Sequence, residues 1–383
     1  MAQIGDPWHY PRTEDAENIL KTLEVGLVSA VAIIEPRRKG KTTFILNDLM
    51  PASRKSGFLP IYINLASTTG DLEALIAGAI VQAVAAEEGF GGKLLRAARS
   101  PVKKVTAKAK IAEAELGGEV ELQGAVKPSS VLVTAFRELS ALGVPVLFLF
   151  DEVHRLAEAT QHGVAWSLRS LLDANRQQFK AVATSSSAAS YEALTTGERQ
   201  AFNRWFTRIE LAPLGDKFTA HLVQVVSKHY PRHSITLREV REAFAALGDS
   251  PKFVRDYLNI RILNPTQPHE TTLRVQLEEA EKETGYADEF NRLPPLARAI
   301  LVALAQEIQA LFSEVARSGF AKALKEAAIS KTSLQRTLRS LADKGLIIRS
   351  DRGEYRIADS LFEQWLSAQI KLGVLPGPLE KDR

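Results

Sequence analysis

Three apolar runs along the chain predict buried strands of a parallel sheet. The runs are Val31–Ile34, Val144–Phe150 and Phe179–Ala183; the first two are continuous rather than alternating, and the third contains one charged residue, Lys180. Continuous apolar runs are typical of parallel sheets that helices cover on both faces. Residues Phe44–Leu49 predict a helix shortly after the first run. The pattern therefore predicts an α/β fold.

The C-terminal part of the chain has a different pattern. Its apolar positions repeat at helical spacing: Leu334, Leu338 and Leu341. Ser330 is a candidate N-cap for this helix, and Gly345 is placed to end it. Two short runs then flank a turn at residues 351–353, which predicts a β-hairpin.

Two further helices are expected ahead of this one, near Pro295–Gln309 and Phe320–Ala328. Three helices followed by a hairpin form the winged-helix pattern, in which the third helix enters the DNA major groove and the wing follows the backbone. Between residues 331 and 356, seven Lys or Arg residues stand against three acidic residues. Double-stranded DNA is therefore an expected partner, and a protein partner that docks on the same module is the alternative. The candidate DNA contacts are Lys331, Gln335, Arg336, Arg339 and Arg352.

A phosphate-binding loop is predicted between the first strand and its helix. Residues 35–42 read Glu-Pro-Arg-Arg-Lys-Gly-Lys-Thr. Such a loop supplies backbone N–H groups at a helix N-terminus, a lysine for the β- and γ-phosphates and a hydroxyl for Mg²⁺. Gly40, Lys41 and Thr42 suit these roles. The nucleotide-binding candidates are Pro36, Arg37, Arg38, Lys39, Gly40, Lys41, Thr42 and Thr43.

Glu35 departs from this pattern, because glycine is usual at the first position of the loop. Glycine there lets the chain turn away from the strand, and a glutamate adds negative charge near a polyanion, so weakened nucleotide binding or turnover is one expectation. The basic residues at positions 37–39 offset that charge. The alternative is a chance Gly-Lys-Thr sequence on a surface loop.

The second apolar run ends at two acids, Asp151 and Glu152. Ligands bind at the carboxyl ends of parallel strands, so Asp151 is expected beside Thr42, where the two residues would hold Mg²⁺. Glu152 is then placed to orient and deprotonate the attacking water. An acid-rich helix N-terminus is the alternative explanation.

Together these motifs resemble the AAA+/STAND class of P-loop ATPases, and most closely the archaeal-type ATPase family with an origin-recognition-like architecture. The resemblance rests on the loop, the acid pair, the polar end of the third run and the segment Arg204–Leu214. It also rests on the paired Arg37 and Arg38 and on Tyr10-Pro11-Arg12, a segment where adenine packs in the family. It implies ATP and Mg²⁺ as cofactors, with Pro11 and Arg12 near the base.

The resemblance also implies roles for residues outside the loop and the acid pair. Thr184, with Ser185 as the alternative, fits a polar residue that positions the lytic water between the acid-bearing and loop-bearing strands. Arg204, with Arg208 as the alternative, fits an arginine that reaches the γ-phosphate of a neighbouring protomer, which implies a homo-oligomer. In the helical lid, Arg255 fits the cation that reports nucleotide state, and Lys252 is the alternative.

The predicted domains are a nucleotide-binding domain at 1–212, a helical lid and linker helix at 213–288, and a winged-helix domain at 289–371, followed by a tail at 372–383. The loop at 265–271 should precede a linker helix at 273–282. An irregular insert at 89–129 suggests a hairpin with one basic and one acidic strand, which either pair their charges or grip a partner.

Composition agrees with an intracellular ATPase. The 383 residues include no cysteine, so neither a disulfide framework nor a thiolate metal site is expected. The sequence shows no leader-like segment and no apolar stretch of about 20 residues, so a cytoplasmic protein that does not enter the membrane is expected. Two functions remain: an ATPase that couples nucleotide state to DNA binding, and a nucleotide-dependent signalling switch or scaffold that docks a protein.

Overall fold

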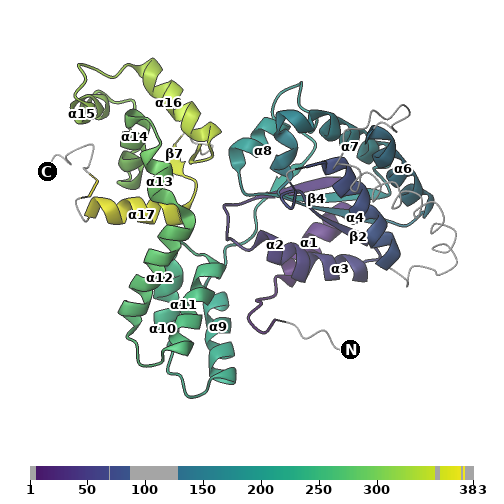
Figure 1. Ribbon diagram of the computed structural model, residues 1–383, viewed down its shortest axis with the longest axis horizontal. Helices are drawn as coiled ribbons and strands as arrows, with labels where there is room; N and C mark the ends of the chain where they lie inside the picture. The colour runs from purple at the N-terminus through teal and green to yellow at the C-terminus, as the bar shows by residue number, and fades with distance from the viewer. Residues whose placement is uncertain (1–5, 69, 87–127, 350–353, 372–373, 376–383) are drawn as a thin grey trace, which may run out of the picture. The chain divides into compact units, whose positions relative to one another are not determined.

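The computed structural model describes residues 6–68, 70–86, 128–349, 354–371 and 374–375 (Figure 1). The chain divides into two compact units. Unit 1 takes the N-terminal segment up to Tyr10 together with Pro36–Gly40 and Pro213–Arg383, and unit 2 takes Pro11–Glu35 and Lys41–Ala212.

Three sequence predictions lie outside the described residues. The predicted hairpin insert at 89–129 does so except for residues 128 and 129, with which a helix begins. Arg352 and the turn of the predicted wing are also outside them, as is most of the C-terminal tail.

Unit 2 contains a five-stranded parallel sheet. In spatial order its strands are β2 (Leu59–Asn64), β3 (Val146–Asp151), β4 (Phe179–Ser185), β1 (Ala30–Ile34) and β5 (Thr207–Ile209). The three predicted strands are therefore present as β1, β3 and β4. The third lies between the other two, as the resemblance implied, and it runs through Thr184 to Ser185.

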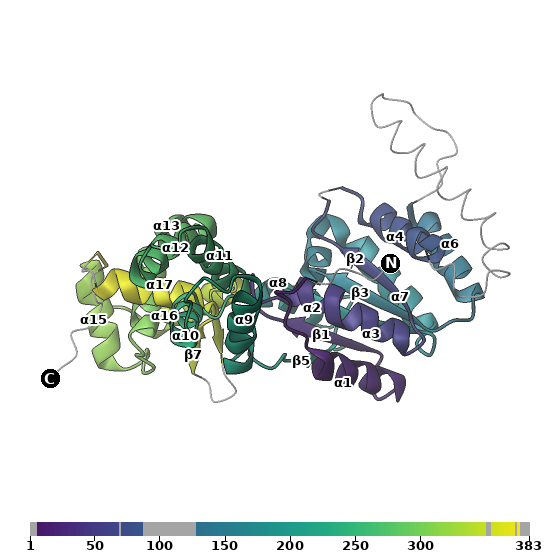
Figure 2. The same ribbon diagram turned by 90° about the horizontal axis from the view of Figure 1, so that it is seen from below.

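Helices cover both faces of this sheet (Figures 1 and 2). One face packs on α1 (Thr13–Glu24) and on the helical run from Lys41 to Lys55, through side chains such as Val31 and Leu149. The other face packs on α4 (Leu72–Ala86), α6 (Pro128–Ala141) and α7 (His162–Ala174). Because both faces are buried, every position of β1, β3 and β4 is buried, which explains the continuous apolar runs.

The helix predicted at Phe44–Leu49 is longer than expected. It begins at Lys41 and comprises α2 (Lys41–Phe44), a π-helical segment η1 (Ile45–Leu49) and α3 (Met50–Lys55). The described part of unit 2 also contains three short helices: η2 (Val153–Ala157) and η3 (Ala159–Gln161) after β3, and α8 (Ala188–Thr195) after β4. No helix among the described residues has the length and apolar character needed to cross a membrane.

Unit 1 begins with a group of helices. They are α9 (Asp216–His229), α10 (Leu237–Ala246), α11 (Pro251–Leu263), α12 (His269–Thr284) and α13 (Tyr286–Asn291). The predicted linker helix is α12, which starts four residues earlier than expected and so shortens the predicted loop. α13 was not predicted from the sequence.

The winged-helix elements follow in unit 1. They are α14 (Pro295–Ala305), α15 (Glu314–Leu324), α16 (Lys331–Asp343), β6 (Ile347–Arg349), β7 (Tyr355–Ile357) and α17 (Ser360–Lys371). β6 and β7 pair antiparallel, as predicted. The range predicted for the second helix, Phe320–Ala328, was wrong, because Ser313 caps α15 by accepting a hydrogen bond from the Ala316 N–H and Lys325 ends it in a left-handed conformation.

A single hydrophobic core runs through all of unit 1, from Phe218 on α9 to Leu366 on α17. Gly248, in the turn between α10 and α11, lies in close contact with the start of α17. A Cβ added at Gly248 would lie 2.7 Å from the Cβ of Leu361 and 2.9 Å from its backbone N and Cα. Gly248 also has a positive φ of 66°. Both features favour glycine at this position.

Replacing Gly248 with alanine should therefore destabilise unit 1 more than replacing Gly285 does. Gly285 has nearly the same φ, 68°, but a Cβ there meets nothing within 4 Å. Both substitutions incur left-handed strain of about 1–2 kcal/mol, and only Gly248→Ala adds overpacking of about 1–3 kcal/mol. Urea unfolding of the two variants measures the difference, and equal losses would contradict the close packing at Leu361.

Candidate functional site

The carboxyl ends of β1 and β3 bring the two main sequence motifs together. Thr42, the second residue of α2, donates a hydrogen bond from its hydroxyl to Oδ2 of Asp151 over 2.7 Å. Asp151 is the last residue of β3 and is only 2% exposed. The sequence prediction placed these side chains beside each other, and they are in contact.

Two further hydroxyl groups hold the Asp151 carboxylate. The Tyr62 hydroxyl donates to Oδ2 over 3.0 Å from β2, and the Thr184 hydroxyl donates to Oδ1 from β4. Burial, followed by the nearby Asp151 charge, raises the pKa of Tyr62 above its usual value, so its hydroxyl remains a donor. Tyr62 was not among the residues predicted from the sequence, because its side chain meets Asp151 only through the pairing of β2 with β3.

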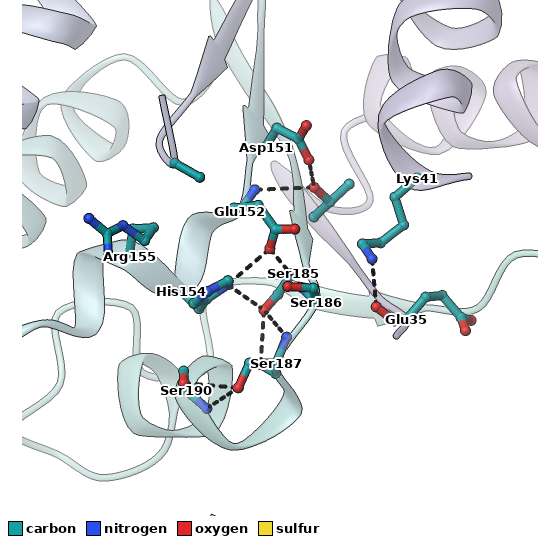
Figure 3. Close-up of polar contacts among 12 residues, drawn as sticks. Glu35, Lys41, Asp151, Glu152, His154, Arg155, Ser185, Ser186, Ser187 and Ser190 are labelled. Atoms are coloured by element: carbon teal, nitrogen blue, oxygen red, sulfur yellow. Dashed lines mark hydrogen bonds and ion pairs between the residues drawn. The ribbon is translucent and has the colours of Figure 1, made fainter. Parts of the chain in front are cut away.

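Lys41 lies at the start of α2 and is 5% exposed. Its ammonium donates to the backbone carbonyl of Glu35 over 2.6 Å (Figure 3). The Glu35 N–H donates in turn to the carbonyl of Ser185, so Glu35 continues the pairing of β1 with β4. Within the loop, positive φ angles occur at Arg38 (65°) and Gly40 (88°). Glu35 does not have a positive φ.

The first position of the loop therefore does not demand glycine. Glu35→Gly should leave ATP affinity level or raise it, because it removes a carboxylate near the phosphates and relieves no backbone strain. Glu35→Gln is the matched control, since it removes the charge and keeps the side-chain length. Equilibrium titration with a fluorescent ATP analogue measures both variants. Several-fold weaker binding by Glu35→Gly would show that Glu35 contributes positively.

The middle of the loop, Pro36–Gly40, groups with unit 1. Within that unit, the Lys39 ammonium donates to the Gly248 carbonyl over 2.5 Å, and the Arg38 guanidinium pairs with Glu283 at 3.1 Å. Arg37 is exposed, and Pro36 and Gly40 are half-buried. In unit 2, Thr43 is exposed on α2. The nucleotide-binding role of these residues stays a prediction.

Glu152 follows β3 in a left-handed backbone conformation, with φ 59° and ψ 49°. Its Oε2 accepts the Ser186 N–H over 2.8 Å and lies 3.1 Å from Nδ1 of His154 (Figure 3). Burial alone would raise the pKa of Glu152, but hydrogen bonds from His154 and Ser186 and the Lys41 charge lower it to about 2. Glu152 is therefore ionised at neutral pH and acts only as a hydrogen-bond acceptor.

The two candidates at the end of β4 point to different partners. The Thr184 hydroxyl accepts the Glu152 N–H over 3.3 Å in addition to bonding Asp151, so it touches both acids. The Ser185 hydroxyl lies 3.1 Å from Nδ1 of His154. Thr184 therefore has the better placement of the two for the predicted sensor role. His154 was missed, although its place two residues after Glu152 was a signal in the sequence.

The other predicted residues of unit 2 lie around this sheet. Arg12 is the N-cap residue of α1. Its backbone N–H donates to the Asp48 carboxylate over 2.9 Å, and its guanidinium carbon lies 5.8 Å from the centroid of the Phe44 ring. Pro11, beside it, is exposed. Arg204 and Arg208 are both exposed. The cation over Trp205 is Arg169 rather than Arg204, so packing on Trp205 does not explain Arg204.

The two predicted lid cations form ion pairs inside unit 1. Arg255 on α11 pairs with Asp6 at 2.9 Å. Lys252, also on α11, pairs with Glu283 at 2.6 Å and with Asp256 at 3.0 Å. These contacts are with carboxylates and do not indicate that either residue binds a phosphate. The sensor role of both residues stays a prediction.

The predicted DNA-facing helix is α16. Its apolar face is buried as expected, and Ser330 caps it by accepting the Ser333 N–H over 3.0 Å. The predicted contact residues on the helix are all exposed: Lys331, Gln335, Arg336 and Arg339. The surface of α16 therefore presents cations to solvent, which suits a polyanion.

The donor set near β3 fits Mg²⁺. This ion takes oxygen ligands and keeps several of its waters, so one carboxylate and one hydroxyl beside phosphate oxygens are sufficient. Thr42 and Asp151 supply that pair. The described residues contain no cluster of three or more His, Cys, Asp or Glu side chains suited to holding a metal by themselves.

Comparisons with known proteins agree with this architecture. A family model described as a probable winged helix domain matches residues 284–368. The Walker-type ATPase PABY2304 of Pyrococcus abyssi is similar in structure, with a TM-score of 0.62 and 17% identity over 94% of this chain and 99% of that chain. The ORC2 protein of Aeropyrum pernix, in ADPNP-ADP complexes, has a TM-score of 0.57 and 13% identity over 94% and 93% of the two chains.

A comparison with curated proteins finds no match. The strand order, the loop between β1 and α2 and the matched C-terminal segment all point to one architecture. The chain thus has the fold of an AAA+-type P-loop ATPase that carries a C-terminal winged-helix domain, as its sequence motifs implied.

Proposed function

We propose that this protein binds Mg-ATP, hydrolyses it and couples the nucleotide state to DNA binding through its winged helix. The observation that carries the proposal is the contact of Thr42 with Asp151. Lys41 precedes Thr42 at the start of α2, and Glu152 follows Asp151 at the end of β3. The chemistry of phosphoryl transfer requires this set: a cation for the phosphates, oxygen ligands for a metal and an acceptor for water.

Each residue has a defined task in this mechanism. Lys41 binds the β- and γ-phosphates, and the loop N–H groups surround them. Thr42 and Asp151 would hold Mg²⁺, which when bound neutralises charge on the phosphates. Glu152 orients the attacking water and accepts its proton. Thr184, which touches both acids, is placed to fix the position of that water.

Two similar structures support the nucleotide part of the proposal. One is named a Walker-type ATPase, and the other was determined in ADPNP-ADP complexes. The direct test is ATP turnover measured with and without duplex DNA at several salt concentrations. We expect turnover that duplex DNA stimulates, with stimulation that weakens as salt increases. Nucleotide binding without turnover and without DNA affinity would instead favour a signalling switch that docks a protein.

The DNA part makes a separate prediction. Arg336→Glu combined with Arg339→Glu should weaken duplex binding and leave ATP turnover without DNA unchanged. Each lost phosphate contact lowers the logarithmic salt slope by about 0.9, so the double variant should lose about 2 units of slope. Fluorescence anisotropy with labelled duplex measures this.

The matched control for that double variant reverses two exposed charges elsewhere in unit 1, Lys228→Glu with Arg232→Glu. It changes the net charge by the same amount and leaves α16 intact. If both double variants lose DNA binding equally, general charge rather than α16 attracts the duplex. If neither loses it, the winged helix is not the DNA-binding surface.

A further inference from the structure

The Glu152 carboxylate is held from two sides through the same oxygen. The Ser186 N–H donates to Oε2 over 2.8 Å from the loop after β4, and Nδ1 of His154 lies 3.1 Å from Oε2 on η2. Neither of these two contacts uses Oε1, and the Ser186 side chain is a further hydrogen-bond partner of the carboxylate. Figure 3 shows Glu152 directed towards Ser186 and His154.

The hydrogen bonds of the Ser185 hydroxyl indicate which ring nitrogen of His154 carries a proton. The Ser185 hydroxyl lies 3.1 Å from Nδ1, but it donates its single proton to the Ser187 carbonyl over 2.9 Å and accepts the Ser187 N–H over 3.2 Å. Both neighbours of Nδ1 therefore act as acceptors: the Ser185 oxygen, and Oε2 of Glu152, which also accepts the Ser186 N–H. Nδ1 must carry a proton, which it shares between them.

The donor loop is itself held in place. Ser187 caps α8 by accepting the Ser190 N–H over 3.1 Å, and its hydroxyl also bonds the Ser190 hydroxyl over 2.9 Å. This cap fixes the backbone next to Ser186, so the Ser186 N–H is a rigid donor. The left-handed backbone at Glu152 aims the carboxylate at that donor.

We propose that His154 is a positioning residue for Glu152: its Nδ1–H and the Ser186 N–H fix Oε2 and leave Oε1 to receive the proton of the attacking water. The proposal rests on the ATP hydrolysis proposed above. In that step the water oxygen bonds to the γ-phosphorus, the bond from phosphorus to the ADP oxygen breaks, and the water proton passes to Oε1. A base that a second group orients in this way loses less freedom when the water binds.

Three variants test the proposal by steady-state kinetics. His154→Ala removes the donor and should lower kcat about 10- to 100-fold, because small misplacement of a catalytic group has effects of this size. KM and the equilibrium affinity for ATP should stay within about twofold, because the contacts that the described part of the chain gives His154 are with Ser185 and Glu152. His154→Asn should restore most of kcat, since its amide nitrogen stands one bond from Cγ, as Nδ1 does. The exposed His162→Ala is the control and should match the wild type.

The outcomes separate positioning from a general structural role. Wild-type kcat in His154→Ala, or equal losses in His154→Ala and His154→Asn, would overturn the proposal. A parallel loss of ATP affinity and kcat in His154→Ala would also overturn it, because that pattern indicates a disturbed fold.

A second measurement does not depend on turnover. Selective ¹⁵N-histidine labelling gives ring-nitrogen shifts for the seven histidines, and the signals missing from His154→Asn identify His154. We expect a protonated Nδ1 in the nucleotide-free protein. An unprotonated Nδ1 would overturn the proposal. A wild-type protein that hydrolysed no ATP but had a protonated Nδ1 would contradict the proposed ATPase function. The same result would still support the contact between His154 and Glu152.

Discussion

Glu152→Gln should lower the turnover number for ATP by about 10²- to 10⁴-fold while ATP affinity stays close to wild type. This range is the usual contribution of a positioned general base. The amide keeps an oxygen that can accept the Ser186 N–H, so the loop after β4 should remain in place. It cannot take a proton from water, so the chemical step slows and binding does not.

The measurement pairs single-turnover hydrolysis with equilibrium titration of ATP. Glu192→Gln is the matched control, because Glu192 is exposed on α8 and undergoes the same chemical change. Turnover within about threefold of wild type in Glu152→Gln would reject Glu152 as the base. Loss of ATP binding in this variant would show instead that Glu152 is required to build the site.

Lys41→Ala should remove measurable ATP binding. The ammonium is expected to contact two phosphate groups, and charge-assisted hydrogen bonds contribute about 1.5–3 kcal/mol each. Losing both corresponds to about 10²- to 10⁴-fold weaker affinity. Turnover should disappear together with binding, which distinguishes this variant from Glu152→Gln.

Lys41 has a structural task as well, because its ammonium bonds the Glu35 carbonyl. Lys41→Met serves as the control, since it keeps most of the buried stem and removes the charge. Equal loss of ATP binding in both variants, with thermal unfolding close to wild type, would assign the effect to the ammonium. ATP affinity within about threefold of wild type in Lys41→Ala would reject the phosphate-binding loop.

Much of this fold can be predicted from the local sequence. The apolar runs of β1 and β3 are continuous because both sheet faces are covered, and this requires no knowledge of the partners. The apolar face and the Ser330 cap of α16 follow from helical spacing and from backbone hydrogen bonding at a helix start. The meeting of Thr42 with Asp151 was also predictable, because parallel strands end at one edge of a sheet.

Other features depend on packing between residues far apart in the chain. α13 and the close contact of Gly248 with Leu361 arise only when unit 1 builds its core, and no local pattern marks these positions. The mispredicted start of α15 is a different case, because its cap at Ser313 is a local signal that the prediction overlooked.

The sequence by itself indicated the residues that we propose for the phosphate chemistry, because residue type and place along a strand are local properties. The tertiary structure alone decided how they are held: Tyr62 on Asp151, and His154 between Ser185 and Glu152. These contacts depend on strand register and on the direction of each side chain after its strand ends. A hydrogen bond requires a donor and an acceptor about 3 Å apart in a suitable direction. The spacing of residues along the chain does not specify the positions of side-chain atoms with that accuracy.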